Sequence, residues 1–230
     1  MEQLKLFEVK DAQRYHFTRR KRRNSLLNLD LTTGIEFTEQ GMPQVKPCYF
    51  SQPPTYWQLF SQAVSNKTAN RCAGVLFFQD DYKFERVWSM PQKYCKILKQ
   101  FPYVASPDFS LYVNMPLEMQ RWNVYRNRLV ASFWQTKGIP VIPTMSWSTS
   151  ESHDFCFDGV YGGTVMISTV GVLNNTVSRQ LWCEGAEEMI YRVKPDHIII
   201  YGRPIIFDFR NIEITYIEYI YQKGGMNYGR

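Results

Sequence analysis

Short, continuous runs of apolar residues recur along the chain from residue 74 onward, and each is followed by a polar stretch. A run of this kind is typical of a strand that is buried on both faces of a parallel sheet. The predicted strands are residues 74–78, 103–105, 139–142, 164–167 and 197–200.

Between these strands, apolar residues recur at three- and four-residue steps, which predicts amphipathic helices. The predicted helices are residues 84–100, interrupted at Pro91, 116–137 and 177–194. The repeated strand–helix–strand order predicts an α/β fold with a mostly parallel sheet of five or more strands and crossover helices, built as an open sheet or a partial barrel.

The two ends of the chain have a different pattern. Residues 55–66 have helical spacing, and residues 212–221 alternate in a way that predicts an antiparallel edge strand. We therefore expect an N-terminal basic arm and irregular segment over residues 1–54, followed by a single α/β domain over residues 55–230.

The composition is that of a globular protein. Among the 230 residues, 44% are hydrophobic and 21% charged, which excludes general disorder, while 13 Gly and 5 Cys exclude a collagen-like chain or a disulfide scaffold. The five cysteines are widely spaced, which favours reduced thiols over a zinc knuckle. The charged N-terminus and the lack of a long apolar run predict a soluble, cytoplasmic protein.

The net charge of +6 is concentrated in one short segment. Residues 14–23 contain six basic residues and no acid, and without these cations the chain has 21 basic and 21 acidic residues. The basic residues of this arm are Arg14, Arg19, Arg20, Lys21, Arg22 and Arg23. With Tyr15 and Phe17 among them, they favour binding to a nucleic-acid backbone, and the alternative is an arm that docks on an acidic protein.

Polar side chains follow every predicted strand. Because ligands of parallel α/β sheets bind beyond the carboxyl ends of the strands, we expect a site along this edge. Two residues of the long helix, Asn123 and Arg126, share a face that could reach it. Arg126 could hold a phosphate there, and the alternative is a structural ion pair with a buried Asp. The candidate ligand-binding residues are Tyr82, Ser110, Tyr112, Asn123, Arg126, Ser146, Trp147, Ser168 and Tyr201.

Three carboxylates at these strand ends are the candidate catalytic groups. Asp80 and Asp81 follow one strand and Asp108 follows its expected neighbour, an arrangement that suits Mg²⁺ and activation of water against a phosphodiester. The alternative is that one Asp caps the next helix and the other pairs with Lys83 or Arg86.

Several common catalytic motifs are absent from the sequence. It contains no Walker A motif, no GxGxxG and no GxSxG, which argues against an ATPase, a dinucleotide enzyme and an α/β-hydrolase. His153 and Cys156 are three residues apart, but they match no known Cys/His signature.

Several segments resemble one known family. They are FFQDDYKFERVW, SPDFSLYVNMP, QRWNVYRNRLVASFWQTKGIPVIPTMSW, ESHDFCFDGV and ISTVG. Together they resemble domain of unknown function 4417 over about residues 70–205. The resemblance implies a bacterial, phage or mobile-element setting, and it brings no established activity.

Two hypotheses follow. The first is a phage or mobile-element protein that binds nucleic acid or a nucleotide at the strand-end edge, with metal-assisted phosphodiester hydrolysis as an extension, so that enzymatic activity stays open. The alternative is a non-enzymatic, anti-defence interaction protein that inhibits a host nucleoprotein or defence complex, with surplus tyrosines as interface anchors.

Overall fold

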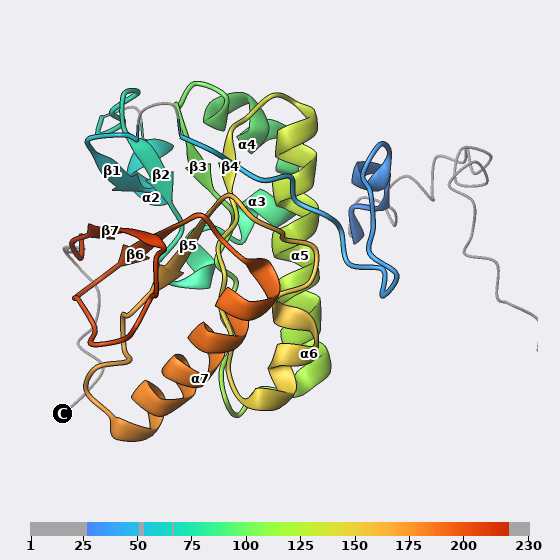
Figure 1. Ribbon diagram of the computed structural model, residues 1–230. Coiled ribbons are helices and arrows are strands. Elements are labelled where there is room, and N and C mark those ends of the chain that lie inside the picture. Colours follow the sequence, from blue (N-terminus) through green and yellow to red (C-terminus); the bar gives the residue numbers. More distant parts are fainter. Residues whose placement is uncertain (1–26, 51–52, 66, 221–230) are drawn as a thin grey trace, which may run out of the picture.

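The computed structural model describes residues 27–50, 53–65 and 67–220, and in these residues all the strands are parallel. The strands form two sheets in which the spatial order follows the chain order (Figure 1). The first sheet consists of β1 (Trp57–Leu59), β2 (Gly74–Leu76), β3 (Val104–Ala105) and β4 (Val141–Ile142). The second consists of β5 (Thr164–Ser168), β6 (His197–Tyr201) and β7 (Glu213–Ile217).

The expectation of five or more strands in one sheet is wrong, because the sheets are separate and contain four and three strands. They meet at a single parallel bridge between Thr144 and Met166. Pro140 and Pro143 flank β4 and have no N–H to donate, so the hydrogen-bond ladder of this strand stays short.

Helices connect successive strands. In Figure 1, α5 runs along one side of the strands and α7 crosses below them. The α-helices are α2 (Phe60–Ala63), α3 (Arg86–Ser89), α4 (Pro91–Leu98), α5 (Leu117–Thr136), α6 (His153–Cys156) and α7 (Thr176–Val193). The 3₁₀ helices are η2 (Leu29–Thr32), η3 (Asp81–Lys83) and η4 (Ser150–Ser152). The predicted break at Pro91 and the two long helices are confirmed.

Two predicted elements are corrected. Residues 55–66, expected as a helix, begin with β1 and continue with the short α2, because Trp57–Leu59 pairs with β2. The tail strand β7, expected to be antiparallel, pairs parallel with β6. Four of its five residues are exposed or partly exposed, as in an edge strand, but the alternation in its sequence does not set the direction of pairing.

The segment before β1 packs on the α/β body. Val45 is buried and forms a parallel bridge with Val160, and the carbonyl of Cys48 accepts a hydrogen bond from the N–H of Thr164 at 2.7 Å. The last residues before the first sheet therefore support the edge of the second sheet.

A buried arginine connects α5 to the strand ends. The Arg128 guanidinium donates to the carbonyls of Thr144, Cys156 and Asp158 and to the side-chain oxygen of Asn127, at 2.7–3.1 Å. Burial lowers the pKa of Arg128 to about 10. These bonds fix α6 and the end of β4 to the long helix.

The five cysteines form no disulfide in the structure. Among the residues that the structure describes, no helix has the length and apolar character that crossing a membrane requires.

Candidate functional site

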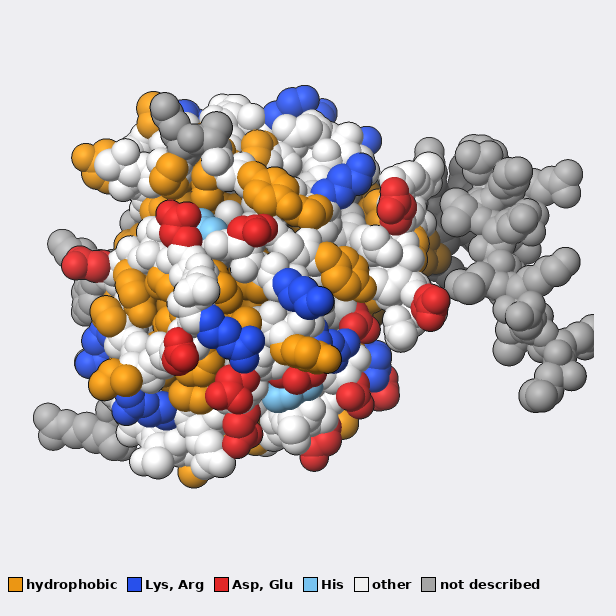
Figure 2. Space-filling model, in the orientation of Figure 1, with side chains coloured by type: hydrophobic (Ala, Val, Ile, Leu, Met, Phe, Trp, Pro, Cys, Tyr) orange, Lys and Arg blue, Asp and Glu red, His pale blue; other side chains and the backbone are white. Residues whose placement is uncertain are grey.

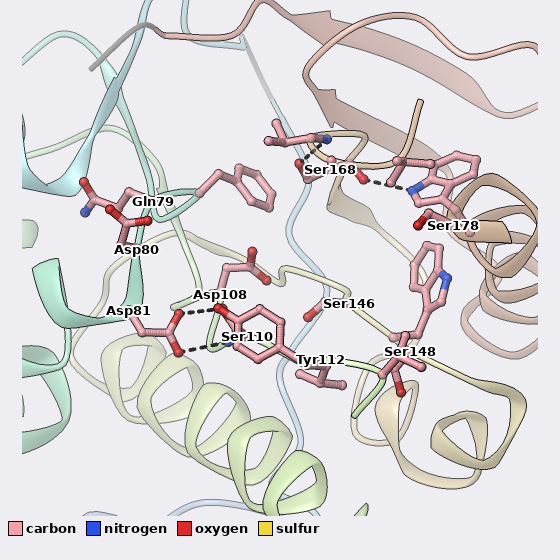
Figure 3. Close-up of a pocket in the computed structure, with 18 of the residues that line it drawn as sticks. Gln79, Asp80, Asp81, Asp108, Ser110, Tyr112, Ser146, Ser148, Ser168 and Ser178 are labelled. Carbon is pink, nitrogen blue, oxygen red and sulfur yellow. Dashed lines mark hydrogen bonds between the residues drawn. The ribbon is translucent and has the colours of Figure 1, made fainter. Parts of the chain in front are cut away.

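A cavity of about 1100 Å³ opens at the carboxyl ends of the strands (Figure 3). Its lining comes from the segments that follow β2, β3, β4 and β5, from the first half of α7 and from the tail after β7. The sequence-predicted residues that line it are Asp80, Asp81, Tyr82, Asp108, Ser110, Tyr112, Ser146, Trp147 and Ser168. The structure thus brings most of the predicted strand-end residues to one pocket.

Asp108 lies in the middle of this pocket, and Figure 3 shows its carboxylate pointing into the open space. Its Oδ1 atom is buried and has no hydrogen-bond partner. Burial raises the pKa of the Asp108 carboxyl to about 7, hydrogen bonding from Ser146 opposes the rise, and the charge of Asp81 adds to it. Near neutral pH this group can accept or release a proton, as general acids and bases do.

The other two carboxylates are engaged with neighbouring groups. Asp81 accepts hydrogen bonds from the hydroxyl of Ser110 at 2.7 Å and from its backbone N–H at 3.1 Å. Asp80 forms an ion pair with Lys83 at 2.9 Å. The expected capping of a helix by an Asp side chain is not found at η3.

The fit of the three carboxylates to Mg²⁺ is poor. They line one pocket, but the described residues contain no group of three or more His, Cys, Asp or Glu side chains that could hold a metal ion. Asp80 and Asp81 are instead bonded to Lys83 and Ser110, so the described residues show no common metal centre.

Exposed tyrosines surround the mouth of the pocket. Tyr82, Tyr112 and Tyr219 belong to its lining, and they are 77%, 60% and 51% exposed. An exposed aromatic ring at the edge of a polar cavity can stack on a flat ligand at little cost in side-chain entropy.

Two tryptophans form the wall on the α7 side. The indole N–H of Trp147 donates to the carbonyl of Leu181 at 3.2 Å, and that of Trp182 donates to the carbonyl of Ser168 at 2.8 Å. Gly185 lies against Trp147, and a Cβ atom at this position would overlap the indole. The close approach of α7 to this ring needs a glycine.

Two predicted ligand-binding residues of α5 lie outside the lining and support the loop below the pocket. Asn123 donates to the carbonyl of Ser110 at 2.8 Å. Arg126 donates to Glu85 at 2.6 Å and stacks over Phe109 at 3.9 Å. Burial lowers the pKa of Arg126, whereas the nearby Glu85 raises it. The ion-pair interpretation fits Arg126 better than ligand contact.

Tyr201 is the third predicted residue outside the lining. Its side chain is buried, its ring stacks on Phe78 at 5.0 Å, and its hydroxyl accepts from the N–H of Ile220 at 3.0 Å. Burial raises the pKa of Tyr201 to about 12. This residue joins the ends of β2 and β6 below the pocket floor.

Sequence reasoning missed supporting residues on α5. Asn127 donates to the carbonyl of Pro107 at 2.7 Å, and Gln120 accepts from the hydroxyl of Ser148 at 2.5 Å. With Asn123 they are polar residues at three- and four-residue steps on the buried face of a helix. That spacing of amides on one face was the available signal.

The basic arm lies outside the described residues, so its six cations have no structural account. Over the face shown in Figure 2, the Lys and Arg side chains of the described residues are scattered among acidic and apolar ones. This agrees with the formal neutrality of the chain without its arm.

Comparisons with known proteins place the chain among phage relatives. The model of a family described as "Domain of unknown function (DUF4417)" matches residues 37–220. The chain is 37% identical over 190 residues to the "Gene 1 protein" of Mycobacterium phage L5, covering 82% of each protein. It is 41% identical over 137 residues to the "Gene 1 protein" of Mycobacterium phage D29, covering 59% of this chain and 51% of that one. No solved structure matches the chain.

Proposed function

The chain belongs to the family of domain of unknown function 4417, and from that premise we propose that its strand-end pocket binds the base of a nucleotide or of an unpaired nucleotide in a nucleic-acid strand. The observation that carries the proposal is the buried, unpartnered Oδ1 of Asp108 inside a cavity with exposed tyrosines at its mouth. A nucleobase supplies both an N–H donor for this oxygen and a flat face for a tyrosine ring.

The charges of the pocket favour the base over the phosphate. Three of its lining residues are acidic, and Lys83 is paired with Asp80. A phosphate in this lining would face repulsion, so we place the sugar–phosphate part outside the mouth. The basic arm, residues 14–23, then binds the backbone, which is a prediction from sequence.

Metal-assisted hydrolysis of a phosphodiester is not part of this proposal, because the carboxylates do not form a metal centre in the described residues. Inhibition of a host nucleoprotein or defence complex stays a prediction from sequence. The relatives in two phages support a phage setting for either function.

The pocket can be tested by its tyrosines. We expect a labelled single-stranded oligonucleotide to bind the full chain in fluorescence anisotropy, and Tyr112→Ala to weaken binding by about tenfold, since stacking of a base on an aromatic ring contributes about 1–3 kcal/mol. Tyr191→Ala is the matched control, because Tyr191 is 69% exposed on α7 and does not line the pocket.

Two results would contradict the proposal. One is the absence of binding of any oligonucleotide or mononucleotide to the full chain. The other is equal binding by the Tyr112→Ala and Tyr191→Ala variants and the unmodified chain, which would place the nucleic acid elsewhere on the surface.

A further inference from the structure

Three of the serine hydroxyls in the pocket lining donate their protons to the protein itself. The hydroxyl of Ser110 donates to Asp81 at 2.7 Å, that of Ser148 to Gln120 at 2.5 Å, and that of Ser168 to a main-chain carbonyl at 3.2 Å. A hydroxyl has one proton and two acceptor lone pairs. Each of these side chains therefore offers an approaching ligand an acceptor.

Three nitrogen donors of the lining are engaged with the protein, and a fourth, the buried Nε2 of Gln79, has no partner but points away from Asp108 in Figure 3. The indole N–H groups of Trp147 and Trp182 donate to main-chain carbonyls, and the Lys83 ammonium is paired with Asp80. In Figure 3 the hydrogen bonds of Ser110 and Ser168 run between residues of the wall.

The carboxylates of the lining add further acceptors around Asp108. Asp108 contributes a buried oxygen that has no partner, and the carboxylates of Asp80 and Asp81 lie in the same lining. A buried acceptor without a donor destabilises the free protein. A ligand that donates to Asp108 therefore gains the free energy of the new hydrogen bond and also removes this cost. We infer that the pocket selects a base with two adjacent N–H donors, which among the common bases is guanine; this inference rests on the proposed function.

The edges of the four common bases differ in what they present to such a wall. Guanine presents its N1–H and 2-amino donors side by side, and a carboxylate can accept from both. Adenine, cytosine and uracil each place an acceptor beside their single donor, and that acceptor would face the oxygens of the pocket. Hypoxanthine has the N1–H of guanine but lacks the 2-amino group. Comparing the two bases therefore measures the contribution of the 2-amino donor alone.

The test compares four mononucleotides by isothermal titration calorimetry with the full chain, above the pKa of Asp108. We expect GMP to bind most tightly, with IMP, AMP and UMP weaker by about tenfold, as expected for loss of one good hydrogen-bonding pair. In the Asp108→Asn variant we expect the ratio of GMP to IMP affinity to fall toward one. Asp154→Asn, an exposed change on α6 outside the lining, is the matched control and keeps the ratio.

The possible results separate this inference from the proposed function. Equal affinities for the four nucleotides, still dependent on Tyr112, overturn the guanine preference and leave the base pocket standing. Binding of none of them overturns the guanine preference, and the oligonucleotide titration with Tyr112→Ala then decides whether the base pocket stands. A third result is that methylguanidine binds, GMP does not, and the Asp108→Asn variant loses the methylguanidine binding. This result overturns the proposal of a base as ligand and assigns the pocket to a cationic side chain of a partner protein. A cooperative thermal unfolding transition of the Asp108→Asn variant shows that this variant is folded.

Discussion

Ser110 bonds to both carboxylate oxygens of Asp81, through its hydroxyl at 2.7 Å and its backbone N–H at 3.1 Å. These two residues lie 29 positions apart and follow β2 and β3. The contact ties two strand-end loops together at the edge of the pocket. Asp81 was predicted as a catalytic carboxylate, and in the structure its contacts hold the loop of Ser110 in place.

Loss of this tie should destabilise the protein. Asp81→Ala removes both hydrogen bonds and leaves the Ser110 N–H unpaired, so we expect a loss of about 2–3 kcal/mol in the free energy of unfolding measured in urea. Asp80→Ala is the neighbouring control, since its exposed ion pair with Lys83 contributes below about 1 kcal/mol. Equal losses in the two variants would contradict the role of the Asp81–Ser110 contact.

The sequence predicted most helices and strands of the fold. The predictions failed where tertiary contacts determine whether a segment is a helix or a strand and how it pairs. Continuous apolar runs located β2 to β6, because a strand buried on both faces needs such residues. Trp57–Leu59 has helical spacing and becomes a strand only through its pairing with β2. The strands divide into two sheets because β4 and β5 pair only at the bridge between Thr144 and Met166. No local sequence pattern predicts this interruption of the pairing.

The candidate site was predictable for a related reason. Parallel strands end at one edge, so the residues after each strand were expected together, and Asp108, Ser146 and Ser168 line one pocket. The functions of Asn123 and Arg126 were not predictable in the same way. The sequence shows that both residues lie on one face of α5. Only the packing shows that this face contacts Ser110 and Glu85 and not a ligand.

Gly185 should be required for the shape of the pocket wall. A methyl group at this position would overlap the indole of Trp147, so we expect Gly185→Ala to lower the free energy of unfolding by about 1–3 kcal/mol, as overpacking does. In an open helix the same change would stabilise by about 1 kcal/mol. Combining it with Trp147→Leu should therefore remove the cost, and urea titrations of the four chains would measure this coupling. A stabilising Gly185→Ala in the otherwise unchanged chain would contradict the close packing.

Arg128 should tolerate no replacement by lysine. Its guanidinium reaches carbonyls of three separate segments, and a single ammonium cannot cover the same acceptors. We expect Arg128→Lys to cost about 2–4 kcal/mol in urea unfolding, because buried carbonyls lose their donors. Arg121→Lys, on the exposed side of α5, is the control with a cost below about 0.5 kcal/mol. A small cost for Arg128→Lys would show that other donors can replace the guanidinium.

The buried carboxyl of Asp108 should make stability depend on pH. Its pKa is about 7 in the folded chain, against about 3.9 for an unfolded Asp, so between these values the folded state binds more protons. The free energy of unfolding should then fall as pH rises from about 4 to about 7 and level off above that range.

The Asp108→Asn variant tests this dependence. It lacks the titrating group, so its stability should lose this decrease, and above pH 7 it should exceed the unmodified chain by about 1–2 kcal/mol, since each pKa unit corresponds to about 1.4 kcal/mol and partial solvent access reduces the effect. Urea titrations of both chains across this pH range measure the difference. Parallel pH curves for the two chains would show that Asp108 is ionised at ordinary acidic pH.

Binding to nucleic acid should depend on salt through the basic arm. Reversal of Arg20, Arg22 and Arg23 to Glu removes contacts to about three phosphates, so the slope of log affinity against log salt should decrease in magnitude by about 2 for a single strand. A matched reversal of three exposed lysines on and after α4, Lys93, Lys96 and Lys99, should change the slope far less. Anisotropy titrations with one oligonucleotide over a salt series give both slopes. An unchanged slope in the arm variant would separate the arm from the phosphate backbone, and the base pocket would then have to account for binding alone.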